Sequence, residues 1–233
     1  MSLGDNGIDS RAIHAKYRPD IYLGERLLAF DEAVVPQLLA DRQMGFPSIE
    51  SRIPGLNCVH SLAPYLKSRG GHRFSTALLE YRSVATTRAL GRARPCLQAF
   101  ASMLTFALTN IEVFSGYSAL VPVPHKLDQV PESYHLYDLL EAVRLLDCAR
   151  KWIVCRDLLR FKRSVASLKE TALHLRRTSI AGAMCANSSR GINDVVLIDD
   201  IIATGATLTE ASRALREGGV TRIVALSLAK RVA

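Results

Sequence analysis

Downstream of about residue 95, apolar positions repeat with the alternating spacings of helices and strands. Helices are predicted around 95–110, 133–150 and 207–217, and the capping-box sequence Ser167-Leu168-Lys169-Glu170 predicts another that ends near 177. Short apolar runs predict strands at 119–123, 152–155, 180–186, 195–198 and 222–228. Strands that alternate with helices over short loops are typical of an α/β fold, with a mainly parallel sheet flanked by helices.

The first 75 residues show no comparable pattern. Prolines and the pair Gly70-Gly71 interrupt the apolar stretches, so only one or two short helices can be predicted there. We therefore divide the chain into a variable N-terminal segment, 1–75, and an α/β domain, 76–233.

The composition is that of an ordinary folded protein. The 233 residues are 48% hydrophobic and 22% charged, which supplies a core and excludes collagenous and compositionally disordered classes. The longest uncharged stretch, 95–111, is shorter than the ~20 residues of a spanning helix. Its polar residues fall on one helical face, so it predicts an amphipathic helix. The N-terminus carries no apolar run, and we expect no signal peptide, no membrane partner and a cytoplasmic location.

Charge and cysteine usage add two expectations. The net charge of +8 is carried by residues 51–100 and 151–233, and it favours phosphates, nucleotides or nucleic acid as partners, with a solvated basic face as the alternative. The five cysteines are scattered and form no Cys-x-x-Cys pair, which indicates reduced thiols. Cys58, His60 and His72 could bind zinc, but a fourth ligand at the usual spacing is missing.

The most informative segment is 195–208. Val195-Val196-Leu197-Ile198 predicts a strand buried on both faces, and Asp199 and Asp200 follow at its carboxyl end, where open α/β sheets bind ligands. Thr204-Gly205-Ala206-Thr207 then leads into a helix, so backbone N–H groups, two hydroxyls and the helix N-terminus can converge on one anion. This order suits a sugar phosphate lying across the top of the strand. In the alternative, the carboxylates only cap the helix and Gly205 only forms a turn.

Other signatures of phosphate chemistry do not fit the sequence. It contains neither a Walker loop nor a G-x-G-x-x-G sequence. Receiver domains place an acceptor aspartate well downstream of their acidic pair, but no aspartate follows Asp200 here.

Residues 195–208 resemble the phosphoribosyl-pyrophosphate (PRPP) binding motif of type I phosphoribosyltransferases. Three further stretches are similar in order and spacing to the ComF family of competence-associated proteins: Ala77-Leu78-Leu79-Glu80-Tyr81-Arg82, Leu120-Val121-Pro122-Val123-Pro124 and the basic stretch 158–184. The resemblance covers about residues 77–233. It implies a type I phosphoribosyltransferase-like core for 76–233, with 1–75 as the hood that reads the acceptor.

The resemblance also implies roles for individual residues. Asp199 and Asp200 would bind the ribose 2′ and 3′ hydroxyls, directly or through Mg²⁺, and stabilise a cationic sugar. The 5′-phosphate would be held by Ala203, Thr204, Gly205, Ala206 and Thr207. His125 and Lys126 would form the pyrophosphate loop. The implied reaction is Mg²⁺-dependent displacement of pyrophosphate from C1 of PRPP by a nitrogen acceptor, a nucleobase or an amine, with Lys126 and Mg²⁺ neutralising the leaving group.

The chain departs from the ComF pattern in two places. Its N-terminal segment has no cysteine-rich zinc motif, and residues 125–135 lack the arginines that usually follow the Val-Pro-Val-Pro strand. A second function therefore stays open: a non-catalytic PRPP- or nucleotide-binding regulator, or a DNA-uptake accessory protein, on the same fold. The sequence also leaves open nucleic acid as a partner and assembly into a homodimer.

The remaining candidates each have more than one interpretation. A basic group could form a flap over pyrophosphate, contact nucleic acid or make a solvated surface: Arg160, Lys162, Arg163, Arg176 and Arg177. Tyr134, His135 and Tyr137 could stack on a base or pack at the start of a helix. Trp152 is expected in the core.

Overall fold

The computed structural model describes Ile53 and residues 55–65, 73–85, 90–127, 134–147, 152–165, 176–188 and 191–231. The elements, in chain order, are β1 (Cys58–Tyr65), α3 (Arg73–Ala85), α4 (Leu90–Asn110), the short 3-10 helix η1 (Glu112–Phe114), β2 (Ala119–Pro122), α5 (His135–Leu146), β3 (Ile153–Val154), β4 (Leu159–Phe161), α6 (Arg176–Ile180), β5 (Met184–Ala186), β6 (Asp194–Ile202), α7 (Ala206–Glu217) and β7 (Arg222–Arg231).

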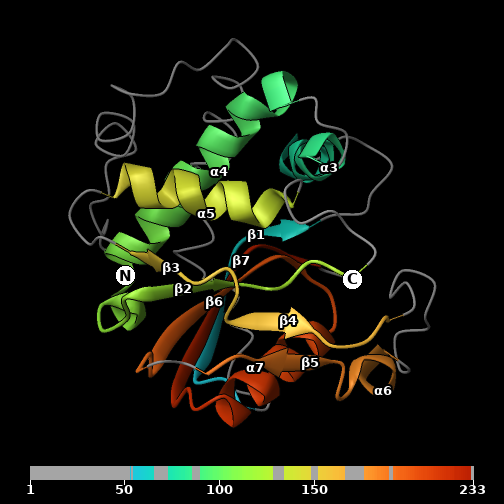
Figure 1. The fold of residues 1–233 in the computed structure, drawn as a ribbon. Helices are drawn as coiled ribbons and strands as arrows, with labels where there is room; N and C mark the ends of the chain where they lie inside the picture. Colours follow the sequence, from blue (N-terminus) through green and yellow to red (C-terminus); the bar gives the residue numbers. More distant parts are fainter. Residues whose placement is uncertain are drawn as a thin grey trace, which may run out of the picture.

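A five-stranded sheet in the order β1-β7-β6-β2-β3 forms the centre of the molecule. All of its neighbouring strands are parallel. β6 lies in the middle, and residues 195–200 are buried because layers of structure cover both faces of a parallel sheet. Helices α3, α4 and α5 gather over one face, whereas α7, α6 and the antiparallel pair β4–β5 lie over the other (Figure 1). The predicted α/β fold with a mainly parallel sheet is confirmed.

The chain leaves β2 and β6 in opposite directions across the sheet. From β2 it passes through α5 to β3, at one edge, and from β6 it passes through α7 to β7, on the side of the other edge. β2 and β6 are neighbours, so the strand order reverses between them. Ligands of open α/β sheets bind outside the carboxyl ends of the strands at such a reversal. The fold therefore singles out the ends of β2 and β6 before any side chain is considered.

Several predicted elements are confirmed, with small changes at their ends. The helices predicted at 95–110, 133–150 and 207–217 are α4, α5 and α7, and the predicted strands at 119–123, 152–155, 195–198 and 222–228 are β2, β3, β6 and β7. The strand predicted at 180–186 begins later than expected, since Ile180 ends α6 and β5 starts at Met184. The capping box at 167–170 and His72 lie outside the described residues.

The N-terminal boundary of the sheet lies earlier than the sequence indicates. β1 falls inside the segment 1–75, yet it pairs along its length with β7. The α/β core therefore includes Cys58–Tyr65, while residues 1–52 lie outside the described part of the chain. None of the helices in the described ranges combines the length and apolar character that crossing a membrane requires.

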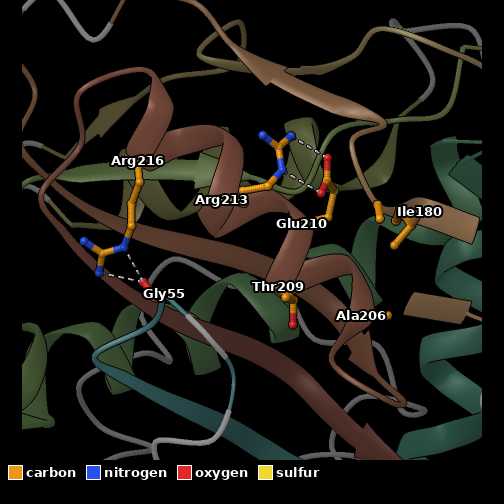
Figure 2. Close-up of a pocket in the computed structure, with 8 residues that line it drawn as sticks. Gly55, Ile180, Ala206, Thr209, Glu210, Arg213 and Arg216 are labelled. Carbon is orange, nitrogen blue, oxygen red and sulfur yellow. Dashed lines mark hydrogen bonds and ion pairs between the residues drawn. The ribbon is translucent and has the colours of Figure 1, made fainter. Parts of the chain in front are cut away.

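A buried carboxylate fastens the β4–β5 layer to α7. Glu210, only 3% exposed, accepts hydrogen bonds from the N–H groups of Gly182 and Met184 at 3.0 and 2.8 Å. Arg213, one turn further along α7, donates to both carboxylate oxygens of Glu210, at 2.9 and 2.7 Å (Figure 2). Arg213 also donates to the carbonyl of Met184. These bonds outweigh the effect of burial and lower the pKa of Glu210.

We expect Glu210→Ala to lower the free energy of unfolding by about 3 kcal/mol, because it leaves buried N–H groups and a guanidinium without their acceptor. Urea unfolding measures the change. Glu217→Ala is the matched control: Glu217 pairs with the same arginine but is 67% exposed, so its loss should leave stability nearly unchanged. Equal effects of the two substitutions would contradict this account of the layer.

Candidate functional site

Two adjacent aspartates occupy the carboxyl end of β6. Asp199 and Asp200 are 8% and 7% exposed, so both carboxylates are almost buried. β2 ends beside them, where the N–H group of Val123 donates to the carbonyl of Ile198 at 2.8 Å. The loops that follow β2 and β6 therefore leave the sheet side by side, at the edge where the strand order reverses.

Asp200 is held by groups from two helices. Its Oδ2 lies 2.8 Å from Nε2 of His135, the first residue of α5, and 2.7 Å from Nε of Arg82 on α3. Its Oδ1 accepts a hydrogen bond from the N–H group of Ile201 at 2.6 Å. Burial alone would raise the pKa of Asp200, but the hydrogen bond from His135 and the charge of Arg82 outweigh it and hold that pKa well below its usual range. Asp200 is therefore an anion at neutral pH.

Asp199 is in the opposite electrostatic situation. Its Oδ1 accepts a hydrogen bond from the N–H group of Asp200 at 2.9 Å. Burial and, next, the negative charge of Asp200 raise the pKa of Asp199 to about 8. The pair consequently carries a single negative charge at neutral pH. The resemblance assigned one shared role to both carboxylates, whereas their surroundings differ: Asp200 is paired with Arg82 and His135, and the pKa of Asp199 is raised.

The loop from Ala203 to Thr207 joins β6 to the N-terminus of α7. Ala203 is exposed, Thr204 and Thr207 are half-buried, and Thr204 Oγ1 accepts a hydrogen bond from the N–H group of Ala206 at 3.4 Å. The N–H groups of Thr207 and Leu208 donate to no backbone carbonyl within the described residues. Two donors at the positive end of a twelve-residue helix are thus left for an anion.

The backbone conformation at position 205 explains why a glycine is found there. Its φ of 75° is the left-handed conformation that residues with a side chain rarely adopt. A Cβ at this position would lie 2.7 Å from Cδ1 of Ile53, so a larger residue would also collide with that side chain. The resemblance gave Gly205 a place in the 5′-phosphate loop, and the structure adds that a side chain at this position would point at Ile53.

A cluster of aromatic rings lines the end of β2. The ring of His125 contacts the rings of Tyr134 and Tyr137 with centroids 5.9 and 6.0 Å apart, and its Nδ1 lies 2.8 Å from the carbonyl of Lys126. The hydroxyl of Tyr134 donates to the carbonyl of Val123 at 2.9 Å. Burial is the main reason that the pKa of Tyr134 is raised well above its usual range. Tyr134 therefore packs against the end of β2, and both tyrosines are half-buried.

Two of the residues that contact Asp200 were not predicted as site residues. Arg82 lies in the stretch 77–82, where the sequence assigned it no role, and His135 was considered only for stacking or packing. The hydroxyl of Tyr81 donates to the carbonyl of His135 at 2.6 Å, which fixes the first turn of α5 against α3. The sequence signal for Arg82 is a single arginine after the apolar positions of a helix. This signal does not show that Arg82 pairs with Asp200, which lies more than a hundred residues further along the chain.

The other candidate residues separate into anchored and exposed groups. Arg163 donates to the carbonyls of Ser179 and Ala181, at 3.1 and 2.8 Å, so it fastens the turn after α6. Arg160 and Lys162 are exposed, and the side chains of Arg176 and Arg177 lie outside the described part of the chain. Trp152 is 2% exposed and donates to Asp147 at 2.9 Å, which confirms its place in the core.

A pocket of about 390 Å³ opens on the outer side of α7 and does not include either aspartate. Its lining, mostly apolar in surface, consists of Gly55, Ile180, Ala181, Ala206, Thr209, Glu210, Arg213 and Arg216. The arginines are engaged: Arg213 with Glu210, and Arg216 with the carbonyl of Gly55 at 3.0 and 2.7 Å (Figure 2). Only Ala206 is shared with the loop after β6.

The described residues include no cluster of three or more His, Cys, Asp or Glu side chains that could hold a metal ion. Cys58 and His60 lie on β1, and His72, the third residue considered for zinc, is outside the described ranges. In comparisons with known proteins, no family model matches the chain and no curated protein is similar to it.

The two aspartates should respond oppositely to amide substitution. The pKa of Asp199 is near 4 in the unfolded chain and about 8 in the folded protein. Between about pH 4 and pH 8, folding therefore requires Asp199 to take up a proton, and the free energy of unfolding of the wild type falls as pH rises through this range. Asp199→Asn removes this loss and keeps an acceptor for the N–H group of Asp200. We expect its melting temperature to rise relative to wild type as pH goes from 5 to 8.5.

Asp200→Asn serves as the contrasting variant, since it removes the anion that faces Arg82 and His135. Its melting temperature should fall below wild type at neutral pH, because an arginine is left beside the site without its counter-charge. Thermal unfolding at several pH values measures both variants. A destabilised Asp199→Asn at pH 8.5, or an unaffected Asp200→Asn at pH 7, would contradict the assignment of charge.

Proposed function

We propose that the chain binds PRPP at the carboxyl ends of β2 and β6 and transfers its ribose 5-phosphate group to a nitrogen acceptor. The observation that carries the proposal is the pair Asp199-Asp200 at the reversal of strand order. One short loop later, the N–H groups of Thr207 and Leu208 at the start of α7 donate to no backbone carbonyl of the residues that the structure describes. The resemblance of residues 195–208 to the PRPP-binding motif supports the same conclusion. We place the activity in the cytoplasm.

The loop after β6 suits the 5′-phosphate. The N–H groups of Thr207 and Leu208, the hydroxyl of Thr207 and the helix dipole offer donors and positive potential to one anion. Asp199, whose Oδ1 accepts a hydrogen bond from the N–H group of Asp200, has no cation beside it comparable to the Arg82 and His135 that hold Asp200, so we assign it the ribose hydroxyls. Asp200 holds the arrangement in place through Arg82 and His135.

Mg²⁺ fits this chemistry as an ion that arrives with the substrate. Magnesium prefers oxygen ligands and is commonly bound by one or two carboxylates together with substrate phosphates, and the donors here are carboxylates without a preformed protein cage among the described residues. Asp199 would contact the ion after losing the proton that it holds at neutral pH, and Asp200 would lie behind it with its charge paired to Arg82 and His135. Bound to pyrophosphate, Mg²⁺ would neutralise charge on the leaving group.

The proposed reaction is a substitution at C1 of the ribose. The bond from C1 to the pyrophosphate oxygen breaks, and its electron pair leaves on pyrophosphate. The lone pair of the acceptor nitrogen forms the new bond to C1, and the nitrogen then loses a proton to solvent. An anion beside the ribose stabilises the positive charge that develops on the sugar, and Lys126, in the loop after β2, is the cation proposed to face the leaving group.

One observation favours a second function, a regulator that binds PRPP or a nucleotide without turnover. Both oxygens of Asp200 are engaged by protein groups, which leaves a single carboxylate for the sugar. Among the described residues, the DNA-uptake variant of this alternative draws support from the exposed Arg160 and Lys162. Calorimetry with PRPP and Mg²⁺, followed by measurement of pyrophosphate release with a panel of nucleobases and amines, separates the two. Tight binding without release in a broad panel would favour the regulator.

Thr207→Ala should weaken the binding of ribose 5-phosphate by about 10- to 150-fold, because a hydrogen bond to a charged group contributes about 1.5–3 kcal/mol. Titration calorimetry measures the affinity. Thr221→Ala is the control, since Thr221 is exposed beyond the far end of α7 and donates to the carbonyl of Asn193. Unchanged affinity in Thr207→Ala would place the phosphate elsewhere.

Lys126→Ala should lower turnover more than it lowers affinity for ribose 5-phosphate. Negative charge accumulates on pyrophosphate mainly as the bond to C1 breaks, so a cation facing it acts more on the transition state than on a ligand that lacks pyrophosphate. Steady-state kinetics and calorimetry on the same variant measure the two effects. Equal losses would assign Lys126 to general binding.

A further inference from the structure

We propose that Arg82, on α3, contacts the pyrophosphate of PRPP and supplies positive charge that the loop after β2 lacks. The inference rests on the proposed function, but it concerns a residue from a different element and a different part of the sequence. It starts from an arginine beside the site whose terminal Nη groups donate to no residue in the described part of the chain.

Arg82 lies beside Asp200 without donating a hydrogen bond to it. Its Nε is 2.7 Å from Oδ2 of Asp200, and the two side chains are paired by charge. Within the described part of the chain, Arg82 donates no hydrogen bond to any residue. Its side chain is 32% exposed, so the guanidinium reaches solvent at the carboxyl edge of the sheet.

Several other arginines fasten the fold or pair on its surface. Arg163 donates to loop carbonyls, Arg213 to Glu210, and Arg216 to the carbonyls of Gly55 and Thr221. Arg144 and Arg156 pair with Glu141 on the surface of α5. Arg82 differs because its partner is a buried site carboxylate and its Nη groups donate to none of the described residues.

The position of Arg82 matches the side of the site where pyrophosphate is expected. Asp200 contacts His135, whose ring lies 4.9 Å from that of Tyr134, and Tyr134 donates to the carbonyl of Val123 at the end of β2. Arg82 is therefore part of the group that surrounds the start of the loop containing His125 and Lys126. The phosphate cradle on α7 lies at the end of β6, so the two anionic ends of PRPP would meet different elements.

The chemistry of the guanidinium suits this role. Nε, the nitrogen nearest the side-chain stem, is the atom beside Asp200, which leaves the terminal Nη groups beyond it. A planar pair of N–H donors matches two oxygens of a phosphate group, and such contacts are among the stronger hydrogen bonds in proteins. The ion pair with Asp200 can persist while the Nη groups bind pyrophosphate.

The test compares two ligands that differ only in pyrophosphate. Calorimetry measures the affinity of PRPP and of ribose 5-phosphate, each with Mg²⁺, for wild type and Arg82→Gln. We expect the affinity for PRPP to fall about tenfold or more in the variant, and that for ribose 5-phosphate to stay within about threefold. Arg144→Gln is the matched control, because Arg144 is an exposed arginine on α5 paired only with Glu141.

Arg82→Lys keeps a positive charge beside Asp200 but has no planar fork. It should retain ribose 5-phosphate affinity and show a PRPP affinity between those of wild type and Arg82→Gln. If Arg82→Gln does not fold, as thermal unfolding would reveal, the PRPP loss in Arg82→Lys carries the test. Full PRPP affinity in a folded Arg82→Lys then overturns the inference.

The outcomes separate this inference from the proposed function. Equal losses for both ligands in Arg82→Gln would mean that Arg82 acts only by positioning Asp200, and no loss for either would remove it from the site; both results overturn the inference while PRPP binding stands. A wild-type protein that binds neither PRPP nor ribose 5-phosphate overturns the proposed function itself.

Discussion

The negative charge of Asp200, buried at the carboxyl end of β6, constrains everything around it. A carboxylate removed from water is stable only if cations and donors surround it, and here they come from α3, from α5 and from the backbone of β6 itself. Arg82 and His135 must therefore lie where they do. Their helices cover one face of the sheet, so the charge also fixes how that layer meets the edge where β2 and β6 end.

This constraint separates the roles of two residues that look identical in the sequence. Successive side chains of a strand point to opposite faces, so Asp200 meets the helices α3 and α5 while Asp199 turns toward the face that carries α7. Burial and, next, the anion of Asp200 raise the pKa of Asp199, so it keeps a proton at neutral pH. A ligand that lies across this edge would meet α7 and Asp199 on one face, and Arg82 on the other.

The sequence was sufficient for features set by local pattern. The apolar run of β6 and the helical spacing of α4 and α5 predicted these elements. β1 escaped notice because Pro64 and polar residues interrupt its pattern, which an edge strand tolerates. The contacts of Asp200 with Arg82 and His135 join residues far apart in sequence, 65 positions in the case of His135, and no periodicity records such a contact.

In the proposed site, positive charge for pyrophosphate comes from Arg82 on helix α3 and not mainly from the loop after β2, and this changes how the site would work. A cation on a loop must be ordered when the ligand binds, which costs conformational entropy. Arg82 instead follows Tyr81, which is 2% exposed, contacts the ring of Phe100 on α4 and donates to the carbonyl of His135 on α5. Its helix is thus fixed on two sides before any ligand arrives. Charge held in advance in this way stabilises a departing anion most effectively, because no reorganisation is required as the bond breaks.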